Sequence, residues 1–179
     1  GPIMASADTM FITVTGRGGH ASQPHAALDP IPVACEIVQA LQTMITRTID
    51  VFDPSVVTVG RISAGTTNNV IPETAHIEGT IRAVSESTRS KVRDGIRRVA
   101  EGVGAAHDAQ IDVQFHDGYP VTVNNPGSAD FSLDVARELA VGESSLSKER
   151  MATDWQARGD GVNDDFLALY RHHFGRNYY

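Results

Sequence analysis

The chain has 179 residues, of which 41% are hydrophobic, and it carries a formal net charge of −7. This length favours one domain or slightly more, and the composition is typical of a globular protein with a core. The negative charge argues against a nucleic-acid partner, and no apolar run is long enough to span a membrane. The first ten residues, GPIMASADTM, do not resemble a signal peptide, so we predict a cytoplasmic protein.

The first half of the chain predicts three strands and one helix. Residues 10–15 (MFITVT) alternate and are rich in β-branched residues, which is typical of a strand. Residues 29–47 predict a helix, because an Asp-Pro pair opens the segment and apolar residues recur at three- and four-residue steps. Cys35 falls within this apolar pattern, so we predict that it is a buried small hydrophobic residue. Residues 55–63 and 74–84 predict two further strands.

The second half predicts a helix, a strand and another helix. Ser85 can cap a helix whose apolar stripe comprises Val92, Ile96, Val99 and Val103. The basic residues of RSKVRDGIRR (89–98) alternate with apolar ones, which favours a solvated helix face over an anion-binding patch. Residues 109–117 predict a fourth strand, and an Asn-Pro pair opens a helix over residues 125–142.

The order of elements from residue 10 to about residue 120 is therefore β-α-β-β-α-β. With right-handed crossovers, this order builds a four-stranded antiparallel sheet with both helices on one face. That arrangement is the ferredoxin-like two-layer sandwich of the α+β class. In the third strand, the polar face comprises His76, Glu78, Thr80 and Arg82.

The loop TGRGGHASQPH, residues 15–25, is the first candidate site. His20 and His25 could bind a metal, but zinc needs three or four converging ligands, and no Cys, Asp or Glu stands at a matching spacing. The glycines resemble a phosphate loop only weakly, because the lysine of a P-loop is missing. Besides metal binding, two interpretations remain open: a polar turn, or a loop that presents a histidine to a developing negative charge.

The loop AGTTNNVIP, residues 64–72, is longer than the usual connection between antiparallel neighbours, and it follows the second strand at the same end of the sheet. Asn69 is either a turn residue or an amide that binds a substrate carbonyl or carboxylate. Arg82 is either a solvated charge or a bidentate partner for a carboxylate. The remaining histidines are interpreted as surface residues rather than metal ligands: His76, His107, His116, His172 and His173.

Three stretches, residues 1–31, 56–83 and 118–126, together resemble the co-catalytic zinc amidohydrolases and metallopeptidases, peptidase family M20. This family includes aminoacylases, and the chain is most similar to its hippurate hydrolase-like branch. The elements Gly-Gly-His-Ala…Pro-His, Asn-Val-Ile-Pro and Glu-Gly-Thr-x-Arg occur in order and at family-like spacing. The resemblance covers roughly residues 1–127.

The resemblance implies a domain organisation. Residues 10–120 would form the lid or dimerisation domain, which the family inserts between two halves of its catalytic domain. Residues 1–9 would be the junction from the first half, and residues 121–179 a partial C-terminal catalytic segment with a divergent tail. Within that segment, GVNDDF at 161–166 is a weak match to the family's Gly-x-Glu-Asp-Phe element.

The resemblance also implies roles for three residues. His20 is expected to reach a neighbouring subunit's active site and to stabilise the tetrahedral oxyanion, while Asn69 and Arg82 are expected to hold the carboxylate or acyl part of the substrate. Connectivity places Arg82 at the opposite end of its strand from the other two residues, roughly 25 Å away at about 3.3 Å per residue. If all three serve one site, they must come from two subunits.

The family uses two divalent metals, zinc or manganese, whose ligands lie largely before the GPIMAS stretch, so we expect this chain to bind none. The resemblance therefore implies the dimerisation and lid portion of an amidohydrolase that cleaves N-acyl amino acids or peptide-like substrates. We expect a homodimer and expect the chain alone to be inactive. The alternative hypothesis is a non-catalytic dimerisation or regulatory module built on the same sheet.

Overall fold

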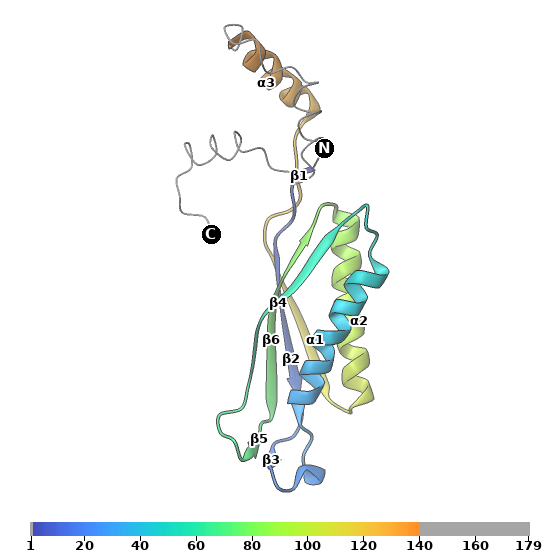
Figure 1. The fold of residues 1–179 in the computed structure, drawn as a ribbon, viewed down its shortest axis with the longest axis vertical. Helices are drawn as coiled ribbons and strands as arrows, with labels where there is room; N and C mark the ends of the chain where they lie inside the picture. Colours follow the sequence, from blue (N-terminus) through green and yellow to red (C-terminus); the bar gives the residue numbers. More distant parts are fainter. Residues whose placement is uncertain (1, 140–179) are drawn as a thin grey trace, which may run out of the picture. The chain divides into compact units, whose positions relative to one another are not determined.

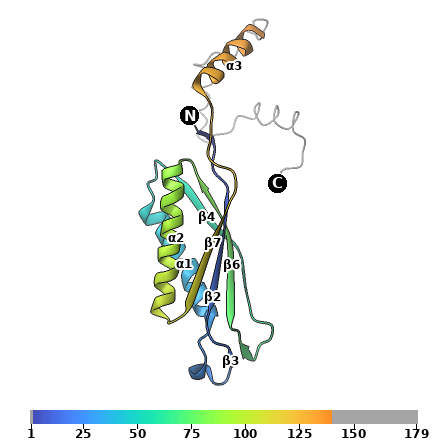
Figure 2. The same ribbon diagram turned by 180° about the vertical axis from the view of Figure 1, so that it is seen from behind.

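The computed structural model describes residues 2–139, which fall within two compact units, Gly1–Asn124 and Asn125–Tyr179. The first unit contains a four-stranded antiparallel sheet in the order β4-β6-β2-β7. Two long helices cover one face of this sheet (Figures 1 and 2). The main elements are β2 (Asp8–Thr15), α1 (Pro30–Thr48), β4 (Ser55–Ala64), β6 (Thr74–Ala83), α2 (Glu86–Ala106) and β7 (Gln110–Asp117).

These elements confirm the predicted α+β class, with helices packed on a four-stranded antiparallel sheet. Helix α1 begins as predicted, because the backbone N–H of Ile31 donates to Asp29 Oδ1 at 2.9 Å. Helix α2 begins at its predicted cap, where the N–H of Thr88 donates to Ser85 Oγ at 3.1 Å. None of the described helices is both long and apolar enough to cross a membrane.

The core lies between the sheet and the two helices. Every second residue of β2 points into it, and α1 and α2 contribute residues at helical spacing. Its fully buried side chains include Met10, Ile12, Ile37, Leu41, Ile77, Ile81, Val92 and Ile96. Burying this apolar surface is the main favourable contribution to folding.

The prediction that Cys35 is buried is wrong, because the thiol is exposed. The buried stripe of α1 includes Val33, Ala34 and Ile37. Cys35 lies between these positions along the chain and therefore faces away from the sheet. An apolar residue inside a helical pattern is buried only when it falls on that stripe.

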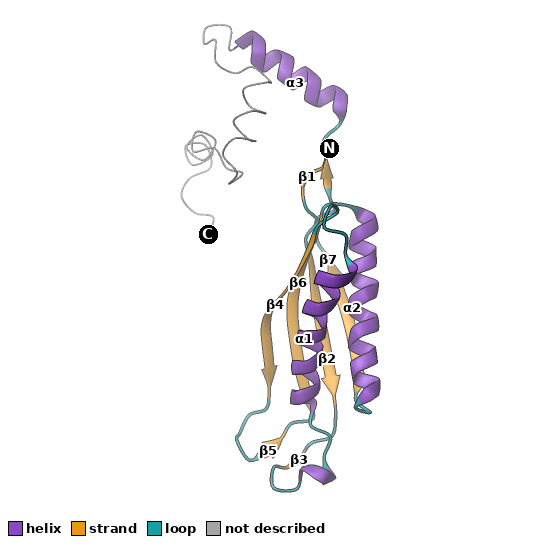
Figure 3. Ribbon diagram, turned by 45° about the vertical axis from the view of Figure 1, so that its right-hand side comes forward, coloured by secondary structure: helices purple, strands orange, loops and turns teal. Residues whose placement is uncertain are grey.

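Two pairs of short strands extend the sheet's ends, and the sequence did not predict either pair. At one end, β3 (Gly19–His20) pairs with β5 (Val70–Ile71), and the 3₁₀ helix η1 (Pro24–Ala26) follows β3. At the other end, β1 (Pro2–Met4) pairs with β8 (Thr122–Val123). Figure 3 shows β3 and β5 beyond one end of the sheet and β1 beyond the other.

We call the first of these ends, residues 16–28 and 65–73, the loop end. The opposite end, residues 2–8, 83–89 and 117–123, is called the Arg89 end.

The Arg89 end contains a buried ion pair. Asp8 accepts two hydrogen bonds from Arg89, one from Nη2 at 2.6 Å and one from Nε at 2.7 Å. The backbone N–H of Gly118 donates to the same carboxylate at 3.2 Å. The Arg89 guanidinium holds the pKa of the Asp8 carboxyl below its ordinary value, and the carboxylate in turn raises the pKa of Arg89.

This pair corrects one prediction about α2. Residues 89–98 were expected to form a solvated helix face, but Arg89 is buried. Strand β2 also begins at Asp8, two residues earlier than predicted, because Asp8 pairs with Ile81 on β6 and with Asp117 on β7. Arg93 extends the cluster by donating to Asp117 at 2.7 Å.

The second unit contains α3 (Pro126–Leu139). The N–H of Ser128 donates to Asn125 Oδ1 at 3.1 Å, so the helix begins at the predicted Asn-Pro pair. The predicted end of this helix at residue 142 and the GVNDDF element at 161–166 lie outside the described residues.

Candidate functional site

The backbone of the His20 loop is fixed by hydrogen bonds along both of its sides. On one side, His20 pairs with Val70 in the β3–β5 ladder, and the N–H of Ala21 donates to the carbonyl of Asn69 at 3.1 Å. On the other side, Arg17 and Leu28 exchange two backbone hydrogen bonds of 2.9 and 2.8 Å. The loop therefore presents its side chains from an ordered backbone.

The glycines of the GRGG run allow close backbone packing. A Cβ atom at Gly16 would overlap the carbonyl oxygen of Leu28, and one at Gly18 would lie 3.0 Å from the carbonyl oxygen of Ile71. Neither glycine has a positive φ, so their role is steric rather than conformational. The run thus joins the end of β2 to two neighbouring segments, which accounts for its sequence without a phosphate ligand.

The side chain of His20 is exposed and is bonded through one of its two ring nitrogens. Nδ1 lies 3.2 Å from the backbone nitrogen of Ser22 and 2.7 Å from its Oγ. Sequence reasoning did not single out Ser22. The His-x-Ser spacing could have indicated it, since a serine two residues after a polar side chain can form a local hydrogen bond with that side chain.

Within residues 2–139, no group of three His, Cys, Asp or Glu side chains converges to hold a metal ion. His25 lies in η1 and is exposed. The described residues therefore do not fit the metal-binding interpretation of His20 and His25.

Asn69 lies beside His20, as the sequence predicted from the position of its loop. Its backbone carbonyl accepts the hydrogen bond from Ala21, and its side-chain Oδ1 accepts one from Thr67 Oγ1 at 3.2 Å. With Oδ1 accepting this bond, the NH₂ group is the hydrogen-bond donor of the side chain. The structure thus brings His20 and Asn69 together at the loop end.

Arg82 lies next to the Arg89 end. It is exposed near the C-terminal end of β6, where it pairs with Val56 of β4, and its Nη1 donates to the carbonyl of Ile81 at 3.0 Å. The N-terminal residue of β6, Thr74, pairs with Thr15 next to the loop end. At about 3.3 Å per residue, Arg82 is roughly 25 Å farther along the strand. The structure therefore does not bring Arg82 together with His20 and Asn69 within one chain.

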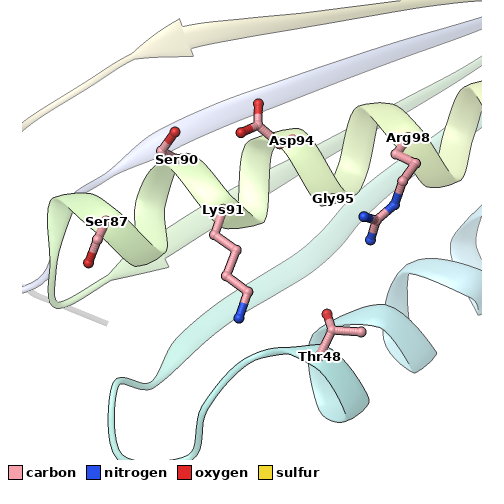
Figure 4. Close-up of a pocket in the computed structure, with 7 residues that line it drawn as sticks. All are labelled: Thr48, Ser87, Ser90, Lys91, Asp94, Gly95 and Arg98. Atoms are coloured by element: carbon pink, nitrogen blue, oxygen red, sulfur yellow. The ribbon is translucent and has the colours of Figure 1, made fainter.

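A separate hollow of about 530 Å³ lies between the C-terminal end of α1 and the first half of α2. The residues that line it are Thr48, Ser87, Ser90, Lys91, Asp94, Gly95 and Arg98. Figure 4 shows the Lys91 and Arg98 side chains directed toward α1, while Ser90 and Asp94 are directed away from it. The hollow contains none of the three predicted site residues.

Residues 6–108 match a family model described as a peptidase dimerisation domain, that of the M20 peptidases. The match covers more than half of the chain, and the chain therefore belongs to the M20 peptidase family. This finding confirms the resemblance that the three sequence elements indicated.

Two curated relatives illustrate the extent of the similarity. Thermostable carboxypeptidase 2 of Saccharolobus solfataricus is 42% identical over 131 residues, which are 73% of this chain and 33% of that protein. Hippurate hydrolase of Campylobacter jejuni is 39% identical over 139 residues, which are 78% of this chain and 36% of that protein.

Among solved structures, the Bacillus subtilis protein YXEP, described as a dinuclear metal binding peptidase from the M20 family, matches with a TM-score of 0.62 and 32% identity. That alignment covers 78% of this chain and 33% of YXEP. The chain thus spans about a third of the length of the relatives that it matches.

Proposed function

We propose that this chain is the dimerisation portion of a metal-dependent amidohydrolase that cleaves the amide bond of N-acyl amino acids. In this proposal His20 acts in the active site of a partner subunit. The observation that carries the proposal is the ordered loop, which exposes His20 next to Asn69 at one end of an M20 dimerisation domain. Hippurate hydrolase, one of the relatives, is named for such a substrate.

The chemistry of the exposed groups suits this role. An imidazole N–H that donates to the developing oxyanion stabilises the tetrahedral transition state, and removing one such donor costs about 10²–10³ in kcat. The Asn69 amide would bind the acyl part or carboxylate of the same substrate. Arg82 would bind the substrate carboxylate in the site that the other subunit's His20 reaches, because a single chain separates the two residues by the length of β6.

Within residues 2–139, no group of three His, Cys, Asp or Glu side chains converges to hold the metals of this proposal, zinc or manganese. We therefore propose that their ligands belong to the catalytic portion of the complete enzyme.

We further infer that the strand order β4-β6-β2-β7 represents the ferredoxin-like arrangement and that dimers form along a sheet edge or through the helices. Strand β4 is an edge strand with exposed apolar residues, Val56 and Ile62, at its two halves. An edge strand has unpaired backbone groups that a second copy can pair with. Light scattering after size-exclusion chromatography should give the mass of a dimer. The cytoplasmic location stays a prediction.

The direct test of inactivity uses the purified 179-residue chain. With zinc or manganese added, we expect no turnover of hippurate. Turnover that a chelator abolishes would show that this chain holds a complete metal site, contrary to the proposal.

A chimera tests the role of His20. Residues 1–124, the first compact unit, would replace the matching segment of the Campylobacter jejuni hippurate hydrolase. We expect the chimera to hydrolyse hippurate and its His20→Ala variant to lose about 10²–10³ in kcat. His76→Ala is the matched control, since His76 is also exposed but lies on the sheet.

The activity of the chimera also tests the alternative hypothesis of a non-catalytic dimerisation module. A chimera that dimerises and hydrolyses hippurate equally well with and without His20 would favour the non-catalytic dimerisation module. Size-exclusion profiles of the wild type and His20→Ala would separate a loss of assembly from a loss of chemistry.

A further inference from the structure

The two contacts between His20 and Ser22 determine which ring nitrogen of the imidazole carries the proton. The backbone nitrogen of Ser22 lies 3.2 Å from Nδ1 and meets the geometry of a hydrogen bond to it. A backbone N–H can only donate, so Nδ1 must accept. An accepting nitrogen carries no proton, and the neutral ring must then be protonated at Nε2.

The hydroxyl of Ser22 has the same effect. Its Oγ is only 2.7 Å from Nδ1, and a hydroxyl next to an unprotonated nitrogen donates its own hydrogen. Both donors come from one residue whose backbone is fixed by the neighbouring contacts of Ala21 with Asn69 and of Gln23 with the His20 carbonyl. The ring is therefore restrained in rotation as well as in tautomer.

We propose that Ser22 is a positioning residue that holds His20 in the Nε2–H tautomer and keeps this N–H available to a ligand. No hydrogen bond to Nε2 is found within residues 2–139. The inference rests on the proposed function, in which the Nε2–H group meets the oxyanion, and it adds the reason why that group is a ready donor. An imidazole with the opposite tautomer would present a lone pair to the oxyanion and repel it.

The other described histidines provide internal comparisons. His76 Nδ1 lies 3.3 Å from Thr13 Oγ1, and because a hydroxyl donates or accepts, this contact imposes no tautomer. His116 lies against the ring of Phe11 without a hydrogen bond. His107 Nε2 is 2.7 Å from a Glu36 carboxylate oxygen, which can only accept, so Nε2 of His107 is protonated.

The test is a long-range ¹H–¹⁵N correlation spectrum of the imidazole rings in the ¹⁵N-labelled 179-residue chain, at a pH where the rings are neutral. The His20 signals are assigned by their loss in His20→Gln. We expect an unprotonated Nδ1 and a protonated Nε2 for His20 in the wild type. Ser22→Ala keeps the backbone donor but loses the hydroxyl, so it should shift the Nδ1 signal part of the way toward that of a mixture of tautomers, and Ser22→Thr, which keeps the hydroxyl, should restore it.

The signals of His107 and His116 should stay unchanged in both variants, which controls for a general change of fold. A wild-type His20 with the proton on Nδ1 would overturn the proposal. An Nδ1 signal that is the same in wild type and Ser22→Ala would also overturn it, because the shorter of the two contacts would then have no influence.

The hippurate hydrolase chimera gives a second readout. Ser22→Ala should lower kcat by less than His20→Ala does and leave KM unchanged, and Ser22→Thr should recover the loss. A rise in KM with kcat unchanged would contradict a positioning role. If the spectra show the expected tautomer but the chimera is insensitive to His20→Ala, the proposed function fails while the tautomer assignment stands.

Discussion

The two ends of the sheet differ in what their polar side chains do. At the loop end, backbone hydrogen bonds and close glycine contacts fix the chain, and the side chains of His20 and Asn69 remain exposed. At the Arg89 end, backbone hydrogen bonds such as that from the N–H of Ala7 to the carbonyl of Tyr119 are joined by a buried ion pair, in which the Asp8 side chain is 0% exposed and that of Arg89 is 9% exposed. Buried polar side chains that hydrogen-bond to each other are unavailable to a ligand, whereas the exposed side chains of the loop end are available.

This difference separates stability from function along one sheet. Substitutions of side chains at the Arg89 end should weaken folding, because they leave a buried charge without its partner. Substitutions of the exposed side chains at the loop end should leave folding intact and affect only what the loop binds, whereas disturbing a close glycine contact there should cost stability. Four substitution or pH experiments test this division.

The largest effect is expected for Arg89→Met, which leaves the Asp8 carboxylate buried and unpaired. The free energy of unfolding should fall by about 3–5 kcal/mol, measured by urea denaturation. Arg61→Met is the matched control, since Arg61 forms an exposed ion pair of 3.1 Å with Glu78. That control should lose no more than about 1 kcal/mol. Equal losses in both variants would remove the distinction between the buried pair and an ordinary surface pair.

The pH dependence of stability should report the same pair. The pKa of Asp8 is lowered from its ordinary value of 3.8, chiefly by the hydrogen bonds from Arg89. The stabilisation is therefore fully present above 3.8 and is lost as the pH falls through the lower pKa of the folded state. We expect the difference in free energy of unfolding between wild type and Asp8→Asn to narrow below pH 3.8. A constant difference down to the lowest pH measured would show that the ionised pair is not responsible.

A smaller effect is expected at the loop end when the backbone contact is disturbed. Gly16→Ala places a Cβ against the Leu28 carbonyl, which also bonds the N–H of Arg17, and should cost about 1–3 kcal/mol. Gly102→Ala, on the exposed face of α2 with no neighbour within 4 Å of the added atom, should instead stabilise by about 0.5–1 kcal/mol. Thermal denaturation should therefore show a lower midpoint for Gly16→Ala and a higher midpoint for Gly102→Ala than for the wild type. Such opposite shifts would distinguish the close contact from the general effect of replacing glycine.

The smallest effect on stability is expected for His20→Ala. Because the side chain is exposed and bonds only to Ser22, its removal should change the free energy of unfolding by less than about 0.5 kcal/mol. A loss comparable to that of Arg89→Met would mean that His20 has a structural role, and the division between the two ends would fail.

The elements whose signals are local could be predicted from the sequence. The alternation in β2 and β6 and the caps Asp29 and Ser85 act over a few residues, and each has the predicted role in the structure. The Asp8–Arg89 pair could not be predicted in this way, because 81 residues separate its members and the basic pattern around Arg89 resembles a solvated face. The strand pair β3–β5 is too short to show any periodicity.

The candidate site was predictable in position but not in detail. The long loop after β4 and the glycine-flanked loop after β2 follow strand ends that share one end of the sheet, which is enough to place Asn69 near His20. The contact of Ser22 with Nδ1 depends on the rotamer of His20 and on the backbone turn at Ala21. Neither can be read from residue types alone.

The central claim is that His20 serves the active site of the partner subunit, and mixed dimers of the hippurate hydrolase chimera test it most directly. One chimera carries His20→Ala with an intact catalytic portion, and the other carries wild-type His20 with its metal ligands substituted. Each alone should be nearly inactive. If His20 acts across the dimer, mixing and reassembling the two should restore hippurate hydrolysis. If activity stays at the level of the separate variants while heterodimers form, His20 does not act in the partner's site and the account is wrong.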